Sequence, residues 1–138
     1  MITVLCGGVG AARLLDVLLR AAPAEDLVGI VNTGDDLTLH GLRICPDLDT
    51  ITYTLAGLNN EVTGWGLSGE TWRVMEELNL LGGEAWFSLG DRDLATHLFR
   101  TQRLTEGATL SEVTAELGAR LGCPVTLLPV TEDSLATM

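Results

Sequence analysis

The sequence predicts an α/β fold with a Rossmann-like, doubly wound and mostly parallel sheet that carries helices on both faces. Three observations support this prediction. Short apolar segments alternate with longer segments of helical periodicity, and the first apolar segment runs directly into a glycine-rich turn. Hydrophobic residues make up 46% of the chain and aromatic residues only 4%, a composition that suits sheets covered by helices. At 138 residues, the chain is expected to form one domain over positions 1–138.

The first element is expected to be a strand ending at Leu5 and Cys6, followed by a glycine turn and a helix over residues 11–22. Glycines let backbone N–H groups approach an oxyanion, and the helix directs its free N–H groups and positive dipole end at the same point. The turn therefore predicts a phosphate site in a nucleotide-binding domain. The expected apolar face of the helix consists of Leu14, Leu15, Leu18 and Leu19.

The turn does not match two common phosphate-binding fingerprints. Arg13 stands where a dinucleotide-binding fingerprint has its last glycine, and the second strand closes on Asn32 and Thr33 instead of an acid. A Walker loop is excluded because all eight cationic residues are arginines and the chain has no lysine. These departures argue against hydride transfer but leave a phosphate site open.

The rest of the chain continues the alternation of strands and helices. Further strands are expected over residues 27–32, 85–89 and 125–128. Further helices are expected over residues 48–55, 70–80, 94–101 and 112–121, the last with Ser111 as its N-cap. Polar loops connect these elements at residues 32–36, 46–50, 64–68 and 90–93.

The acidic balance of the chain limits its partners. The formal net charge is −11, whereas a nucleic-acid or anionic-membrane partner requires clustered Lys and Arg. No segment is apolar enough to span a bilayer and the N-terminus has no secretory signal, so a cytoplasmic protein is expected. The three cysteines lack the spacing of a metal site, which predicts free buried thiols: Cys6, Cys45 and Cys123.

Three polar segments directly follow predicted strands: the glycine turn, residues 32–36 and residues 90–93. Ligands bind at the carboxyl ends of parallel strands, so these segments are expected to converge on one edge of the sheet. Backbone N–H groups would hold a phosphate there, carboxylates a divalent metal, and Arg92 a second anion. Some of the acids also have structural interpretations as turn or capping residues: Asp36, Asp47, Asp49 and Asp93.

Histidine and tryptophan side chains are further candidates. His97 falls one helical turn after Asp93, so the two could form an Asp–His pair, although a structural histidine is the more common outcome. The three tryptophans could form the walls of a pocket for a flat ligand: Trp65, Trp72 and Trp86. Core packing is the better interpretation of Trp86, which lies within a predicted strand.

Several segments together resemble one known family. They are residues 7–13 (GGVGAAR), 31–36 (VNTGDD), 44–50 (ICPDLDT) and 89–97 (LGDRDLATH), with His40-Gly41, Gly64-Trp65-Gly66 and Glu70-Thr71-Trp72. In this order the segments resemble the 2-phospho-L-lactate transferase family of coenzyme F420 biosynthesis. The resemblance extends from Met1 to about Thr131.

The resemblance implies a transferase that moves a phospholactyl or phosphoenolpyruvyl group from a guanosine-diphosphate-linked donor to the ribityl hydroxyl of the deazaflavin Fo, releasing GMP. It implies catalytic roles for Asp49 and Asp36, and a metal site made of Asp35, Asp36 and Asp49. Oxygen ligands beside phosphate favour Mg²⁺ in that site. Contacts to the donor or to Fo are implied for Gly8, Val9, Gly10, Arg13, Asn32, Thr33, Asp49 and Arg92.

The resemblance also implies a homodimer, and the greater length of that family implies that this sequence corresponds to its N-terminal part. Two other functions stay open. One is a nucleotide-sugar-binding regulator resembling the gluconeogenesis-factor family, which shares a glycine loop and an Asp-Asp turn. The other is a fragment that binds ligand without catalysis. Residues 46–50 and 90–93 favour the transferase over the regulator.

Overall fold

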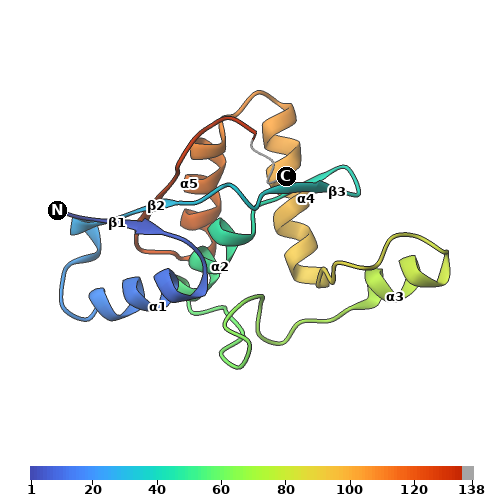
Figure 1. Cartoon of the computed structure of the whole chain (residues 1–138), viewed down its shortest axis with the longest axis horizontal. Helices are drawn as coiled ribbons and strands as arrows, with labels where there is room; N and C mark the ends of the chain where they lie inside the picture. Colours follow the sequence, from blue (N-terminus) through green and yellow to red (C-terminus); the bar gives the residue numbers. More distant parts are fainter. Residues whose placement is uncertain (135–138) are drawn as a thin grey trace.

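A computed structural model describes residues 1–134 of the chain (Figure 1). The elements follow in the order β1 (Ile2–Cys6), α1 (Val9–Leu18), η1 (Ala24–Asp26), β2 (Leu27–Val31), β3 (Leu37–Leu39), β4 (Leu42–Ile44), α2 (Pro46–Leu55), α3 (Arg73–Leu80), α4 (Asp91–Thr105), α5 (Leu110–Leu121) and β5 (Thr126–Pro129). Positions 135–138 of the expected single domain lie outside the described residues.

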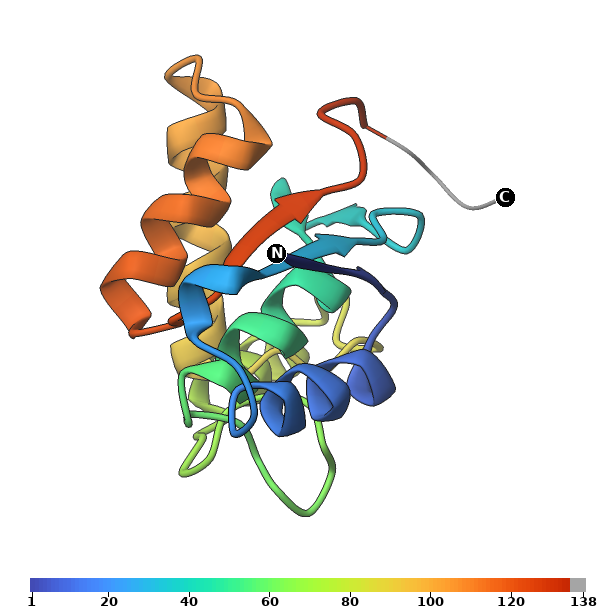
Figure 2. The ribbon, with the colours of Figure 1, turned by 90° about the vertical axis from the view of Figure 1, so that its left-hand side faces the viewer.

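The strands β1, β2 and β5 form a parallel sheet in that order, which confirms the α/β class and the Rossmann-like, mostly parallel sheet. Across the middle of the sheet, Leu5 pairs with Ile30 and Ile30 pairs with Leu128. The chain crosses the sheet in one direction, and right-handed crossovers in one direction place their helices on the same face. Figure 2 shows the helices below and to the left of these strands.

Alternate side chains of the sheet show which face the helices cover. Cys6, Val31 and Leu127 are at most 6% exposed and belong to the main hydrophobic core. Leu5 and Leu128 point to the other face, and they are 81% and 40% exposed. Within residues 1–134, the helices therefore pack on one face of the sheet and not on both as expected, and the opposite face is open to solvent.

A short antiparallel hairpin of β3 and β4 lies between β2 and α2 in the chain, where the sequence predicts no strand. His40 and Gly41 connect the two strands with φ angles of 55° and 73°, the geometry of a tight two-residue hairpin turn. The alternation of Leu37-Thr38-Leu39 and Leu42-Arg43-Ile44 suits such a pair. The inward residues Leu39 and Ile44 pack in a second, smaller hydrophobic cluster.

The expected strand over residues 85–89 is wrong, because this segment has no strand conformation and pairs with no strand. Phe87 and Leu89 pack instead in the second cluster with Met75 and Leu94, so their apolar character serves that cluster and not a sheet. The expected core packing of Trp86 is also wrong. Its side chain is 69% exposed and makes a T-shaped contact with the Phe87 ring, with ring centroids 5.6 Å apart.

Other expected elements are present with shifted ends. The first helix ends at Leu18 instead of at position 22, and Leu14, expected on its apolar face, is 49% exposed. The expected N-cap Ser111 lies inside α5, and Thr109 caps this helix instead. Thr109 Oγ1 accepts a 3.2 Å hydrogen bond from the Glu112 N–H, and the Glu112 carboxylate accepts from the Thr109 N–H. Such a capping box satisfies two free donors at once.

Candidate functional site

A cavity of about 260 Å³ opens where α2 and α4 meet the loops at residues 64–68 and 87–90. Pro46 begins α2, a position where its missing N–H costs no hydrogen bond. Helical spacing then brings polar side chains of both helices to the cavity, namely Asp49 and Tyr53 from α2 and Asp93 and His97 from α4. Two aromatic rings, Trp65 and Phe87, line the same cavity.

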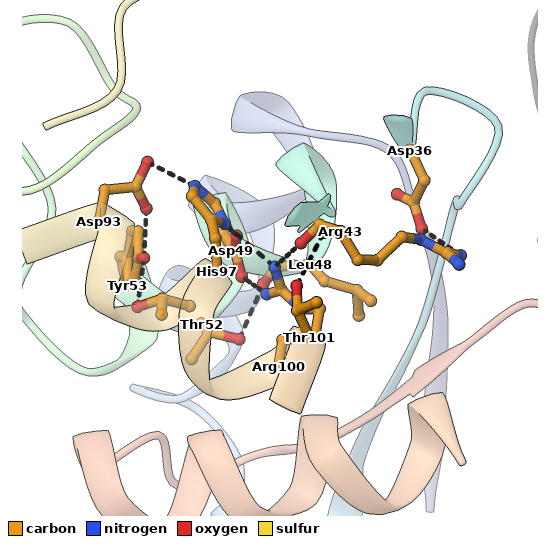
Figure 3. A network of polar contacts seen from close by, with 11 residues as sticks. Asp36, Arg43, Leu48, Asp49, Thr52, Tyr53, Asp93, His97, Arg100 and Thr101 are labelled. Carbon is orange, nitrogen blue, oxygen red and sulfur yellow. Dashed lines mark hydrogen bonds and ion pairs between the residues drawn. The ribbon is translucent and has the colours of Figure 1, made fainter. Parts of the chain in front are cut away.

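Asp93 connects the two helices (Figure 3). The Tyr53 hydroxyl donates to Asp93 Oδ1 at 2.5 Å, and His97 Nε2 lies 3.1 Å from Asp93 Oδ2. Burial acts to raise the pKa of Asp93, but the hydrogen bonds from His97 and Tyr53 outweigh it, so the pKa lies below its ordinary value. Burial raises the pKa of Tyr53, which therefore stays a donor. Asp93 is thus held as a carboxylate beside the cavity.

Arg100 and Asp49 form a buried ion pair behind His97 (Figure 3). Arg100 is 2% exposed and donates to Asp49 Oδ1 and, at 3.1 Å, to the Arg43 carbonyl. Its Nη1 also lies 3.2 Å from His97 Nδ1. A guanidinium can only donate, so Nδ1 is assigned as the acceptor and Nε2 carries the proton toward Asp93.

The second oxygen of Asp49 is an unsatisfied acceptor of this network. Asp49 is 6% exposed, yet its Oδ2 has no hydrogen-bond partner and lies 3.6 Å from His97 Nδ1. Burial raises the pKa of Asp49, against the opposing charge of Arg100. Asp49 lines the cavity, but Oδ2 itself is buried, so a ligand would reach this oxygen only after a movement of the Asp49 side chain.

A group of potential metal ligands includes the same residue. Within residues 1–134, one ligand atom each from Asp49, Asp93 and His97 lie within 4.8 Å of one another. The two carboxylates outnumber the guanidinium of Arg100, so with a neutral imidazole the group carries a net negative charge. The arrangement can therefore accept a cation.

Of the three acids expected to form a metal site, Asp35 and Asp36 lie apart from Asp49 in its potential metal group. Asp35 is exposed, whereas Asp36 is buried and accepts a 3.3 Å hydrogen bond from Arg43 Nη2. Burial raises the pKa of Asp36, while hydrogen bonds from Cys45 and Arg43 act to lower it. Neither Asp35 nor Asp36 belongs to the potential metal group around Asp49. All three cysteines are free thiols, as expected, but only Cys6 and Cys45 are buried, whereas Cys123 is half-buried.

The glycine turn lies beside the first turn of α2. A Cβ on Gly8 would stand 3.1 Å from Asp47 Oδ1, and Asn32 Nδ2 donates to Asp47 Oδ2 at 2.9 Å. Nothing lies within 4 Å of a Cβ placed on Gly10, so the turn is open there. Gly8 and Asn32, both expected to contact the donor or Fo, thus lie next to the Asp47 side chain. From the sequence, Asp47 is interpreted only as a capping residue.

The other expected donor contacts are spread around this turn. Thr33 is fully buried, and its Oγ1 has no hydrogen-bond partner. Val9 and Arg13 line a separate polar cavity of about 470 Å³, together with Gly64. A Cβ on Gly64 would stand 2.9 Å from Val9, so this loop approaches α1 closely.

Arg92 contacts a loop instead of the main cavity. Its Nη1 donates to the Ser68 carbonyl at 2.8 Å, and its side chain lines a groove with Tyr53 and Thr96. Trp72 lines an adjoining cavity of about 300 Å³, which shares Trp65 with the main one. The expected aromatic walls are therefore present at two of three tryptophans.

Two members of the network, Tyr53 and Arg100, belong to no segment that suggested chemistry. A helical-spacing signal could have found both, because Tyr53 lies four residues after Asp49 and Arg100 lies three residues after His97. The exact partners depend on how α2 and α4 cross, which local spacing does not specify.

Among the helices of residues 1–134, none combines the length and the apolar character needed to cross a bilayer.

Comparisons with known proteins agree on one family. The family model described as 2-phospho-L-lactate transferase CofD matches residues 2–138. A phosphoenolpyruvate transferase of Streptomyces griseus is 54% identical over 137 residues, which cover 99% of this chain and 43% of that protein. Proteins of the same name from Nocardia farcinica and Mycobacterium marinum are 51% and 49% identical, with 41% and 45% of their lengths covered. The chain thus spans less than half the length of these relatives.

Proposed function

The chain belongs to the 2-phospho-L-lactate transferase CofD family, and on that premise we propose that it supplies the acceptor site of a coenzyme F420 transferase. The group transferred is phosphoenolpyruvyl or phospholactyl, the donor is its guanosine-diphosphate-linked form, and the acceptor is the terminal ribityl hydroxyl of the deazaflavin Fo. The new bond joins that oxygen to the phosphorus of the transferred group, and GMP leaves. The name of the relatives supports the phosphoenolpyruvyl donor.

The observation that carries this proposal is the unpartnered Oδ2 of Asp49 at a cavity lined by Trp65 and Phe87. Aromatic walls suit a flat deazaflavin ring. A buried carboxylate oxygen suits the hydroxyl that has to be aligned with phosphorus, because phosphoryl transfer depends mainly on positioning and on charge stabilisation.

The chain's own residues divide this work. Arg100 holds Oδ1 of Asp49, which leaves Oδ2 to accept a hydrogen bond from the Fo hydroxyl and then its proton. Tyr53 and His97 orient Asp93 at the same cavity. Asp36, the second expected catalytic acid, would act from beside Arg43.

A metal ion would fit the carboxylates of Asp49 and Asp93, because Asp49 Oδ2 is an orphaned buried ligand and the two acids outnumber the guanidinium of Arg100. His97 would join them only by giving up its contact with Arg100 or with Asp93, since one ring nitrogen accepts there and the other carries the proton. We assign Mg²⁺ to this site on the preference of this hard cation for carboxylate oxygen. When bound, the ion would neutralise charge on phosphate oxygens. Asp35 and Asp36, expected in this role, would act only after rearranging toward Asp49.

The donor is proposed to bind at the glycine turn. Gly8, Val9 and Gly10 would offer backbone N–H groups to its phosphates, while Arg13 and Asn32 would complete the contact from the surrounding segments. Thr33, the remaining expected contact, is fully buried and would reach the donor only after a rearrangement. The family resemblance adds two proposals, that Arg92 contributes to Fo binding and that the protein acts as a homodimer in the cytoplasm.

The test is a titration of the chain with Fo, with GDP and with Mg²⁺, followed by deazaflavin fluorescence and heat. The decisive variant is Asp49→Asn combined with Arg100→Gln, which removes the carboxylate without leaving Arg100 unpaired. Asp26→Asn, at an exposed aspartate of η1, is the matched control. Saturable Fo binding that only the double variant loses supports the proposal. Binding of a nucleotide sugar without Fo would favour the regulator, and unchanged Fo binding in the double variant would contradict the role of Asp49.

A further inference from the structure

The N-termini of α3 and α4 exchange acidic caps. Asp91, at the start of α4, accepts hydrogen bonds of 3.1 Å from the backbone N–H groups of Arg73 and Val74 in α3. Glu70, just before α3, accepts from the N–H groups of Arg92 at 2.9 Å and Asp93 at 3.2 Å in α4. Each carboxylate thus satisfies free donors at the positive end of the other helix.

Gly90 makes room for the Glu70 carboxylate. A Cβ on Gly90 would stand 2.1 Å from Glu70 Cδ, which is a severe steric clash. The φ angle of Gly90 is −71°, which any residue adopts, so the glycine is needed here for space and not for backbone conformation. An alanine at this position would expel the carboxylate from the end of α4.

The exchanged caps connect two segments that line the acceptor cavity. Trp65, in one segment, precedes Glu70 by five positions, and Asp93, in the other, donates its backbone N–H to the Glu70 carboxylate. Glu70 and Gly90 line the adjoining cavity of about 300 Å³, which shares Trp65 and Asp93 with the main one. No described hydrogen bond joins the Glu70 side chain to a residue of the main cavity except through the backbone of α4.

We propose that Glu70 and Gly90 are positioning residues for the acceptor cavity. By fixing the first turn of α4 against the loop at residues 64–72, they set the place of Asp93 and His97 relative to Trp65. They touch no reacting atom. The inference rests on the proposed binding of Fo at this cavity.

Four variants test the inference in the whole chain. Glu70→Gln keeps the size but removes the charge, Glu70→Ala removes the carboxylate, and Gly90→Ala expels it. Glu70→Ala combined with Gly90→Ala completes the cycle and separates the two causes. We expect each single variant to weaken Fo binding roughly tenfold, or 1.4 kcal/mol, with GDP affinity unchanged. Gly90→Ala should add nothing once Glu70→Ala is present, because both act through one contact. Glu77→Gln and Gly118→Ala are the matched controls, since Glu77 has an exposed side chain on α3 and a Cβ on Gly118 meets only an ordinary contact.

Amide and imidazole NMR give a readout that does not require Fo. In Glu70→Gln and Gly90→Ala, the N–H signals of Arg92 and Asp93 should lose hydrogen-exchange protection, and the His97 ring nitrogens should shift because Asp93 moves. If the unaltered chain fails to bind Fo, the proposed function fails, and these signals alone decide the inference. Unchanged signals, an equal loss of Fo and GDP binding, additive variants, or tighter Fo binding without the carboxylate would each overturn it.

Discussion

Asp49 and Arg100 use one buried contact for both packing and chemistry. The guanidinium occupies one carboxylate oxygen, and the other remains unpartnered beside the cavity. A buried ion pair adds little net stability, since desolvation offsets the attraction, but loss of one partner leaves an uncompensated buried charge. Effects on binding and on stability are therefore coupled at this residue, and single variants mix the two.

Asp49→Asn is expected to lower the free energy of unfolding by about 3 kcal/mol, because Arg100, which is 2% exposed, loses its counter-charge. The double variant Asp49→Asn/Arg100→Gln should lose less than the sum of the two single variants, because no buried charge is left over. Urea denaturation of the four proteins measures the coupling. Additive losses would mean that water reaches Arg100 and that the pair is not buried in solution.

Capping decides where α5 begins. The sequence pattern favours Ser111, but the structure assigns the N-cap to Thr109 and places Ser111 inside the helix. We expect Thr109→Ala to lower the free energy of unfolding by about 1 kcal/mol, because the capping box is lost. The reference is Ser111→Ala, which removes an exposed hydrogen bond to Glu132 and should cost less. The opposite ranking in thermal or urea unfolding would show that Ser111 is the true N-cap.

The cap on α3 predicts a pH dependence. Hydrogen bonds from the Val74 N–H and the Thr71 hydroxyl lower the pKa of Asp91, despite some desolvation. A lowered folded-state pKa means that the cap contributes stability above the ordinary aspartate pKa of about 4 and loses it as the pH falls through the folded value.

The start of α3 should therefore remain ordered at pH 5 and loosen only below about pH 4. The amide chemical shifts of Arg73 and Val74, followed by NMR during an acid titration, report this change. Asp91→Asn should abolish the titration of both signals. A midpoint above pH 4 would contradict the cap, because it would mean that folding raises the pKa of Asp91.

Prediction from sequence succeeded where a local pattern has one physical solution. Strand β2 and helix α2 show their periodicity within a few residues, and the interpretation of Asp49 and Asp93 as residues of helix starts agrees with their places in the first turns of α2 and α4. The apolar run at residues 85–89 has two solutions, a strand or a patch of core, and only the position of Met75 and Leu94 selects the second.

The site was predictable to the same extent. Asp93 and His97 pair within one helix, which spacing reveals, and the structure has this pair. Asp36 and Asp49 lie close in sequence, but the hairpin between them turns Asp36 toward Arg43. The partnership of Asp49 with Arg100 joins residues 51 positions apart, and only the packing of α2 against α4 produces it.

At the scale of the whole molecule, the sheet is covered on one side only within residues 1–134. Winding in a single direction accounts for this, because a second set of helices requires strands added beyond β1 in the other direction. The relatives are more than twice as long as this chain, so the statement that this face is uncovered applies to residues 1–134 and not to the relatives.

The two faces should therefore respond differently to substitution. Leu15→Ala removes a fully buried side chain and should lower the free energy of unfolding by about 2–5 kcal/mol. Leu5→Thr alters a side chain that is 81% exposed and should change it by less than about 0.5 kcal/mol. Urea denaturation at two protein concentrations measures both. A large, concentration-dependent cost of Leu5→Thr would show that association of chains covers this face in solution, because a monomer with an open sheet has no contacts there to lose.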